Sequence, residues 1–147
     1  MGDKDVKEKI IELVREYPIG ALATIDKNRP WVRYIGFDID DDCRLFAASY
    51  TESRKVDQIK VNHNVHVVFG LDPREEEKPF INYAGTARIL MDSATRERFW
   101  QEMYGDFFSG PDDPNYAIIE VSPQLIEYYG TYLREPEIYR PADAEEK

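Results

Sequence analysis

Residues 49–59 read SYTESRKVDQI and place Arg54 and Lys55 directly behind a run of hydroxyl side chains. Hydroxyl groups, the N–H groups at a helix N-terminus and paired cations are the features that bind a phosphate group. The same residues also allow a purely structural interpretation, because Ser49 and Glu52 match the S-x-x-E capping box that opens many helices. A phosphate site and a capped helix with surface cations are both open at this point.

The other residues with reactive or metal-binding side chains form weaker patterns. His63 and His66 are three residues apart near the start of a predicted strand, where alternation points them to opposite faces, so we expect no shared metal site. Cys43 follows an acidic turn and is not expected to act as a nucleophile. The acids at 75–77 are interpreted as a solvated loop. The sequence therefore predicts no metal site, and it assigns no catalytic residue.

Size and composition predict one folded domain over residues 1–147. A hydrophobic content of 42% and ten tyrosines are typical of a chain with a packed core. The net charge of −10 argues against a nucleic-acid partner, and the single cysteine excludes an internal disulfide. Charges throughout the first twenty residues and the absence of a long apolar run indicate no signal peptide and no membrane partner, so we expect a cytoplasmic protein.

Hydrophobic spacing and turn residues predict three helices and seven strands. The predicted helices cover 5–17, 54–62 and 93–104, with Ser93 as the cap of the third. The predicted strands cover 19–26, 29–40, 43–49, 64–72, 80–90, 116–123 and 124–133, and a loose polar tail follows from about residue 134. Gly85, in the middle of a strand, suggests a bulge, a bend or a close backbone approach.

Hairpin connections dominate this order of elements, and strands do not alternate regularly with helices. The pattern favours a mainly β (α+β) fold, a closed or nearly closed antiparallel barrel with peripheral helices.

An ordered set of features over residues 5–130 resembles the pyridoxamine 5'-phosphate oxidase-like family of FMN-binding split β-barrels. The set comprises Arg33 in the second strand, a short acidic turn, Ser49, the run Ser53-Arg54-Lys55, Ile59, residues 62–64 before a valine-rich strand, and the strand NYAGTARIL. The resemblance implies an antiparallel split β-barrel that forms a homodimer, with FMN in clefts between the subunits.

The resemblance also implies which residues bind the cofactor. Those expected to hold the FMN phosphate are Arg33, Ser53, Arg54 and Lys55, and those expected beside the flavin ring are Ala48, Ser49, and Tyr128 or Tyr129 of a partner subunit by stacking. The physics agrees, because two guanidinium groups and an ammonium can neutralise a phosphate dianion. The N-terminus of the helix at 54–62 adds roughly half a positive charge.

The chain departs from the oxidase itself at several positions. Asp38 stands where a basic residue is expected, Phe80 stands where a Gln is expected, and the C-terminal run of substrate-binding Arg and His residues is absent. The resemblance therefore implies a small member similar to general stress proteins. The predicted function is an FMN-dependent oxidoreductase acting on an unidentified small molecule, with the flavin carrying the chemistry. A non-catalytic flavin store or stress sensor, and a deazaflavin- or haem-binding relative, remain open alternatives.

Overall fold

The computed structural model describes residues 5–70, 78–131 and 134–142. Its helices are α1 (Val6–Glu16), α2 (Arg54–Val61), α3 (Ser93–Arg98) and the 3-10 helix η1 (Glu102–Asp106). Its strands are β1 (Ile19–Asp26), β2 (Arg29–Gly36), β3 (Asp38–Ile39), β4 (Leu45–Tyr50), β5 (Asn64–Gly70), β6 (Phe80–Leu90), β7 (Tyr116–Tyr129) and β8 (Glu137–Tyr139).

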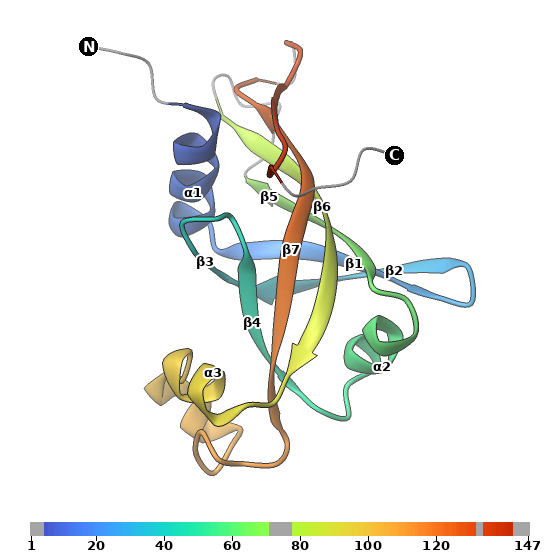
Figure 1. Cartoon of the computed structure of the whole chain (residues 1–147), viewed down its shortest axis with the longest axis vertical. Coiled ribbons are helices and arrows are strands. Elements are labelled where there is room, and N and C mark those ends of the chain that lie inside the picture. The colour runs from blue at the N-terminus through green and yellow to red at the C-terminus, as the bar shows by residue number, and fades with distance from the viewer. Residues whose placement is uncertain (1–4, 71–77, 132–133, 143–147) are drawn as a thin grey trace.

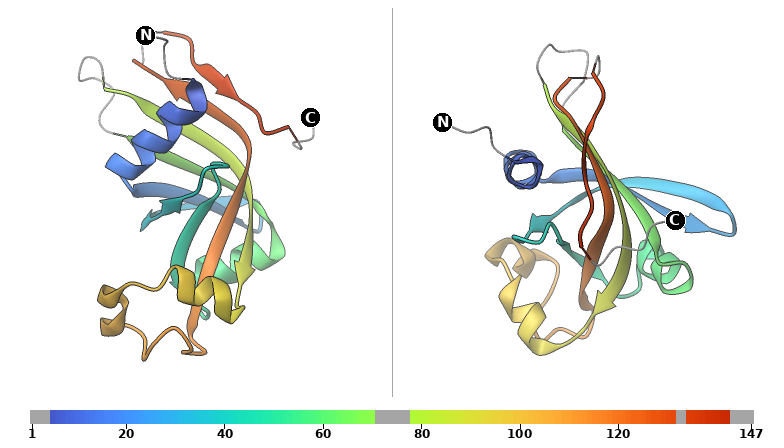
Figure 2. Two further views of the ribbon diagram at one scale, coloured as in Figure 1. Left: turned by 60° about the vertical axis from the view of Figure 1, so that its left-hand side comes forward. Right: turned by 45° about the horizontal axis from the view of Figure 1, so that its top comes forward.

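In the described part of the chain, all strands belong to one antiparallel sheet. Its order is β2-β1-β5-β6-β7-β4-β3, and β8 pairs with β7. The sheet curls into an open half-barrel, with α1 near one end and α2 and α3 near the other (Figures 1 and 2). The predicted antiparallel split barrel with peripheral helices is confirmed.

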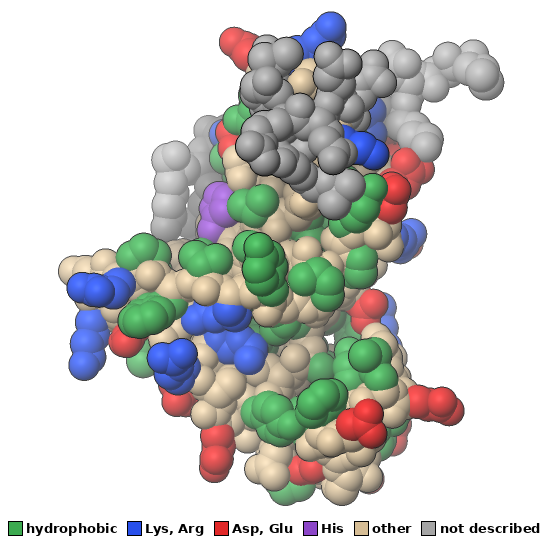
Figure 3. Space-filling model, turned by 180° about the vertical axis from the view of Figure 1, so that it is seen from behind, with side chains coloured by type: hydrophobic (Ala, Val, Ile, Leu, Met, Phe, Trp, Pro, Cys, Tyr) green, Lys and Arg blue, Asp and Glu red, His purple; other side chains and the backbone are tan. Residues whose placement is uncertain are grey.

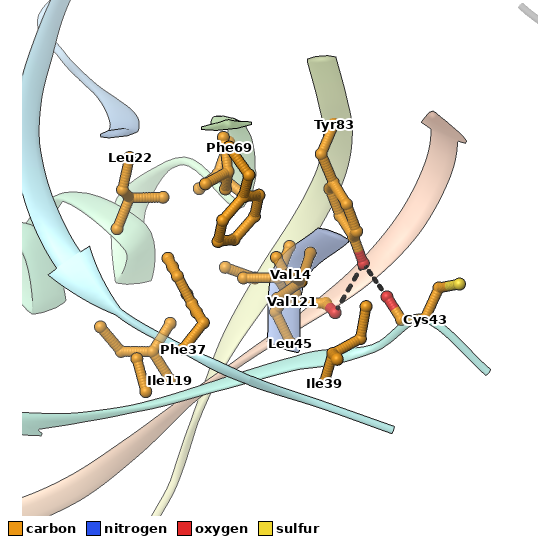
Figure 4. Packing of buried hydrophobic residues seen from close by; sticks show 14 of the residues in the cluster. Val14, Leu22, Phe37, Ile39, Cys43, Leu45, Phe69, Tyr83, Ile119 and Val121 are labelled. Atoms are coloured by element: carbon orange, nitrogen blue, oxygen red, sulfur yellow. Dashed lines mark hydrogen bonds between the residues drawn. The ribbon is translucent and has the colours of Figure 1, made fainter. Parts of the chain in front are cut away.

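The main core lies inside the curl of the sheet. Helix α1 contributes Ile10, Leu13 and Val14, which form one buried stripe because they recur at helical spacing. Tyr83 is fully buried, and its hydroxyl shares its one proton between the carbonyl oxygens of Cys43 and Val121 (Figure 4). This hydroxyl joins β6 to the turn before β4 and to β7, and so holds the curled sheet together.

A second cluster of buried side chains packs α3 and η1 against the end of the sheet. Phe46 of β4 stacks on Phe99 with ring centroids 4.3 Å apart. Tyr116 of β7 is fully buried and contacts the ring of Trp100 edge-on at 5.3 Å. Tyr104 of η1 packs against the same cluster, so these aromatic contacts hold η1 beside β4.

The two strands predicted over 116–123 and 124–133 are replaced by one continuous strand, β7, from Tyr116 to Tyr129. Gly85 pairs with Pro123 while Ala84 pairs with Leu125, so Gln124 is the extra residue of a β-bulge. A bulge tolerates proline, which has no N–H for the ladder. The bulge expected at Gly85 is confirmed, and a Cβ atom there would lie 2.5 Å from the Ser122 carbonyl oxygen.

Two smaller predictions, one on the third helix with its cap and one on the tail, are wrong. The helix predicted over 93–104 divides into α3 and η1, and its cap is Asp92, whose carboxylate accepts from the backbone N–H of Thr95. The tail is not loose throughout, because β8 pairs with β7.

The acids predicted as a loop at 75–77 lie outside the described residues. Among the described helices, none has the length and apolar character to cross a membrane.

Candidate functional site

Helix α2 begins in a tight turn that follows β4 directly. Ser53 is the N-cap, and its hydroxyl accepts from the backbone N–H of Val56 at 3.4 Å. The capping box of Ser49 and Glu52, one of the two interpretations left open by the sequence, does not form, because Ser49 is still part of β4. Its buried hydroxyl lies 3.0 Å from the hydroxyl of Ser53. The two hydroxyls therefore mark the junction of the strand and the helix.

Arg33 of β2 is held in place by neutral acceptors. Its Nη1 donates to the carbonyl oxygens of Leu22 and Trp31, each at 3.2 Å, and to the hydroxyl of Thr24 at 2.7 Å. Its Nη2 donates to Oε1 of Gln58 at 3.1 Å. These contacts fix the guanidinium, and no carboxylate of the described residues pairs with its positive charge.

Arg33, Ser53, Arg54 and Lys55 line one cavity of about 260 Å³. Among the described residues, no carboxylate forms an ion pair with any of the three cations. Burial, and then the charge of Arg54, lower the pKa of Arg33. Burial, and then the charge of Arg33, lower the pKa of Lys55. An anion in this cavity would relieve the repulsion among the cations.

The residues of the cationic cavity belong to the face of the molecule that lies below the β1–β2 hairpin (Figure 3). Basic side chains gather below the projecting β1–β2 hairpin, with hydrophobic side chains around them (Figure 3). Arg54 is exposed, and its guanidinium lies 5.6 Å from the centre of the Trp31 ring. Three of the four lining residues come from the start of α2, and the fourth comes from β2 across the sheet.

A second, mainly apolar cavity of about 390 Å³ lies further along β2. Its walls include Ile35 of β2, Ala48 of β4 and Met103 and Tyr104 of η1. Ala48 precedes Ser49, and Ile35 is two residues beyond Arg33 on the same face of β2, because strand side chains alternate. The structure therefore places both the cationic cavity and the apolar cavity on β2, with Ala48 of the apolar cavity next to Ser49 near the end of β4.

The structure does not bring Tyr128 and Tyr129 to these cavities within one chain. They lie at the far end of β7, roughly 40 Å along the strand from Tyr116, which pairs with the end of β4. Tyr128 packs against the core, and the ring of Tyr129 stacks on Phe80 with centroids 4.6 Å apart. Their predicted contact with the flavin of a partner subunit stays a prediction.

The histidines and the cysteine provide no second centre. His66 is exposed in the middle of β5, and His63 precedes that strand. Within residues 5–70, 78–131 and 134–142, no group of three His, Cys, Asp or Glu side chains could hold a metal ion. Cys43 is fully buried, and burial raises the pKa of its thiol to about 12. It is therefore a poor nucleophile at neutral pH.

Two residues of the site were not predicted from the sequence. Thr24 is fully buried, and its hydroxyl donates to Oε1 of Gln58 at 2.5 Å, so both residues help to hold Arg33. Each lies in an ordinary element, β1 or α2, without a motif of its own. The only sequence signal is a polar residue at an inward position of an otherwise apolar strand.

Comparisons with known proteins give a consistent result. The family described as Pyridoxamine 5'-phosphate oxidase matches residues 6–130. General stress protein 26 of Bacillus subtilis is 30% identical over 126 residues, covering 86% of this chain and 89% of that protein.

Solved structures share the fold. General Stress Protein 26 from Bacillus anthracis superposes with a TM-score of 0.79 at 30% identity, covering 92% of this chain and 98% of that one. A heme binding protein from Mycobacterium smegmatis superposes with a TM-score of 0.77 at 12% identity, covering 96% of this chain and 60% of that one. At that identity the second likeness shows the fold alone.

Proposed function

This chain belongs to the pyridoxamine 5'-phosphate oxidase-like family, and from that premise we propose that it is an FMN-binding flavoprotein that acts as an oxidoreductase. The observation that carries the proposal is the cavity lined by Arg33, Ser53, Arg54 and Lys55. It gathers three cations that have no carboxylate partner in the described part of the chain.

The residues of this cavity fit a phosphate dianion. Arg33 is already oriented by its hydrogen bonds to Thr24 and Gln58, so little order has to be created when the anion binds. Lys55 adds a compact charge, and the exposed Arg54 is able to donate two parallel hydrogen bonds. The N-terminus of α2 contributes further positive potential.

The ring system of the same cofactor would border the apolar cavity. Ile35 and Ala48 would contact the flavin, and the buried Ser49 would lie at the step between ring and phosphate. These side chains exclude water from the ring and fix its position relative to the phosphate. FMN, when bound, supplies hydride and electron transfer, so the proposal needs no protein acid or base.

We propose a homodimer with the cofactor at the interface, in a cytoplasmic protein. The support is the edge of the sheet beside the two cavities, where β2 has no strand on its outer side among the described elements. Val32 and Tyr34 on this strand are 63% and 82% exposed. An exposed apolar edge strand is a liability for a monomer and a natural surface for a second copy.

The visible spectrum of the protein as isolated tests the cofactor, followed by heat release and mass measurement of the chromophore. We expect the spectrum of an oxidised flavin and the mass of FMN. A deazaflavin mass or a haem spectrum would contradict the proposal, and it would support one of the alternatives named from the sequence.

Steady-state oxidation of a reduced nicotinamide, with a quinone or oxygen as acceptor, tests the oxidoreductase part. Continuous turnover by the FMN-loaded protein supports the proposal. Reduction without turnover would instead identify a flavin store or sensor.

A further inference from the structure

The apolar cavity beside Ala48 carries a charge opposite to that of the phosphate cavity. Among the described residues, Asp38 is the only charged side chain that lines it. We propose that this cavity binds a second ligand next to the flavin, and that Asp38 restricts this ligand to uncharged or cationic small aromatic compounds. This inference rests on the proposed function, because it takes the flavin ring to border the cavity.

Asp38 contributes an exposed carboxylate to the lining of the cavity. Asp38 is exposed at the start of β3, where it pairs with Phe46 of β4. Tyr104 of η1 lines the same cavity, so the carboxylate of Asp38 and the phenol of Tyr104 are available to the same ligand. The pKa of Tyr104 is raised by burial and then by the negative charge of Asp38.

The cavity offers no compensating cation in the described part of the chain. Arg98 is near, but its guanidinium lies over the rings of Phe46 and Phe99, at 5.8 and 4.8 Å, and it is not part of the lining. The remaining polar side chains of the lining are the amide of Gln101 and the phenol of Tyr104, and neither is a cation. A carboxylate or phosphate group of a ligand would therefore meet one negative charge and no positive one.

The two cavities together sort ligands by charge. An anionic group is drawn to Arg33 and Lys55, whereas a cationic group is drawn to Asp38. The apolar walls of the cavity that contains Asp38 favour a flat, hydrophobic ligand. A phosphorylated second ligand is disfavoured at the Asp38 end, and its phosphate would compete with that of FMN at the other.

Three probes of similar size and different charge test this inference: benzylammonium, benzyl alcohol and benzoate. Their dissociation constants are measured by NMR titration at low salt, on the FMN-loaded protein and on the FMN-free protein. We expect benzylammonium to bind about tenfold more tightly than benzoate, with the amide shifts concentrated at residues 35–38 and 101–104. The preference should shrink at high salt.

Substitutions of Asp38 test whether its charge causes the preference for the cationic probe. Asp38→Asn should bring the two charged probes to nearly equal affinity, and Asp38→Lys should reverse their order. Benzyl alcohol should bind alike in all three proteins. The matched control is Glu127→Gln, which removes the same charge far along β7 and keeps an acceptor for Asn82; it should leave the preference unchanged.

The outcomes separate this inference from the proposed function. Equal binding of benzoate and benzylammonium to the wild type, or an unchanged preference in Asp38→Asn, would overturn the role of Asp38. FMN affinity is measured on the same samples, and Asp38→Asn should retain it. If FMN fails to bind while the charge preference persists in the FMN-free protein, the proposed function is wrong and the charged cavity stands.

Discussion

Arg33 of β2 and Gln58 of α2 are joined by a hydrogen bond of 3.1 Å between Nη2 of the guanidinium and Oε1 of the amide. The same oxygen accepts the hydroxyl of the buried Thr24 at 2.5 Å. A neutral amide thus orients a cation that has no carboxylate partner among the described residues. The arrangement keeps the full charge of Arg33 available to an anion.

Replacing this amide by a carboxylate should weaken FMN binding. Gln58→Glu keeps the shape of the side chain and gives Arg33 an internal counterion, so the phosphate would compete with it. We expect a loss of about tenfold in FMN affinity, measured by quenching of flavin fluorescence. Stability of the FMN-free protein, measured by urea unfolding, should not fall.

Gln58→Ala serves as the control for that substitution, because it removes the orienting acceptor without adding charge. We expect only a few-fold loss of FMN affinity and a loss of stability of about 1 kcal/mol. If Gln58→Glu binds FMN as tightly as the wild type, the uncompensated charge of Arg33 does not contribute to binding.

Cys43 should make the protein less stable in alkaline solution. Its folded-state pKa is raised from 9.0 to about 12 by burial, so the unfolded chain loses the proton first. The contribution of Cys43 is fully present below about pH 9 and is lost as the pH rises toward 12, by up to about 1.4 kcal/mol per pH unit.

Urea unfolding of the wild type and of Cys43→Ala at several pH values isolates this effect from other alkaline titrations. The stability difference between the two proteins should narrow or reverse as the pH rises above 9. A difference that does not vary between pH 8 and 11 would show that burial of the thiol has no such consequence.

Gly85→Ala should destabilise the protein while leaving the cofactor site intact. The added Cβ would lie 2.5 Å from the carbonyl oxygen of Ser122, so the backbone at the bulge must shift. We expect a loss of roughly 1–3 kcal/mol in urea unfolding and an unchanged FMN affinity. Wild-type stability in this variant would mean that β6 and β7 approach less closely than the structure indicates. The control is Gly105→Ala, where the added Cβ meets no neighbouring atom within 4 Å.

Much of the fold follows from local patterns. Alternating apolar residues and turn residues predict most strands, and Gly85 predicts the bulge, because these features depend on neighbours in the sequence. The continuity of β7 through Pro123 was not predicted, because it depends on pairing with Gly85, 38 positions away in the chain. Sequence reasoning treats proline as a strand end and has no access to that partner.

The candidate site also has a part that the sequence predicts and a part that only the structure reveals. The run from Ser53 to Lys55 predicts a cationic helix start, and the structure adds Arg33 to the same cavity, as the resemblance implied. The support of Arg33 by Thr24 and Gln58 was not predicted, because it joins β1, β2 and α2 through tertiary contacts. Charge at a site is visible in a sequence, whereas the side chains that orient it become visible only in the fold.

The most direct test compares the affinities of FMN and riboflavin, which share the ring and differ by the phosphate. The wild type should bind FMN at least about 100-fold more tightly, since a few charge-assisted hydrogen bonds contribute roughly 3 kcal/mol. In Arg54→Ala, Lys55→Ala this ratio should fall below about tenfold, with riboflavin binding unchanged. The double variant Arg29→Ala, Lys60→Ala removes the same charge outside the cavity and should keep the ratio. Equal affinities of the two flavins in the wild type, or a ratio that survives the loss of Arg54 and Lys55, would contradict phosphate binding at this cavity.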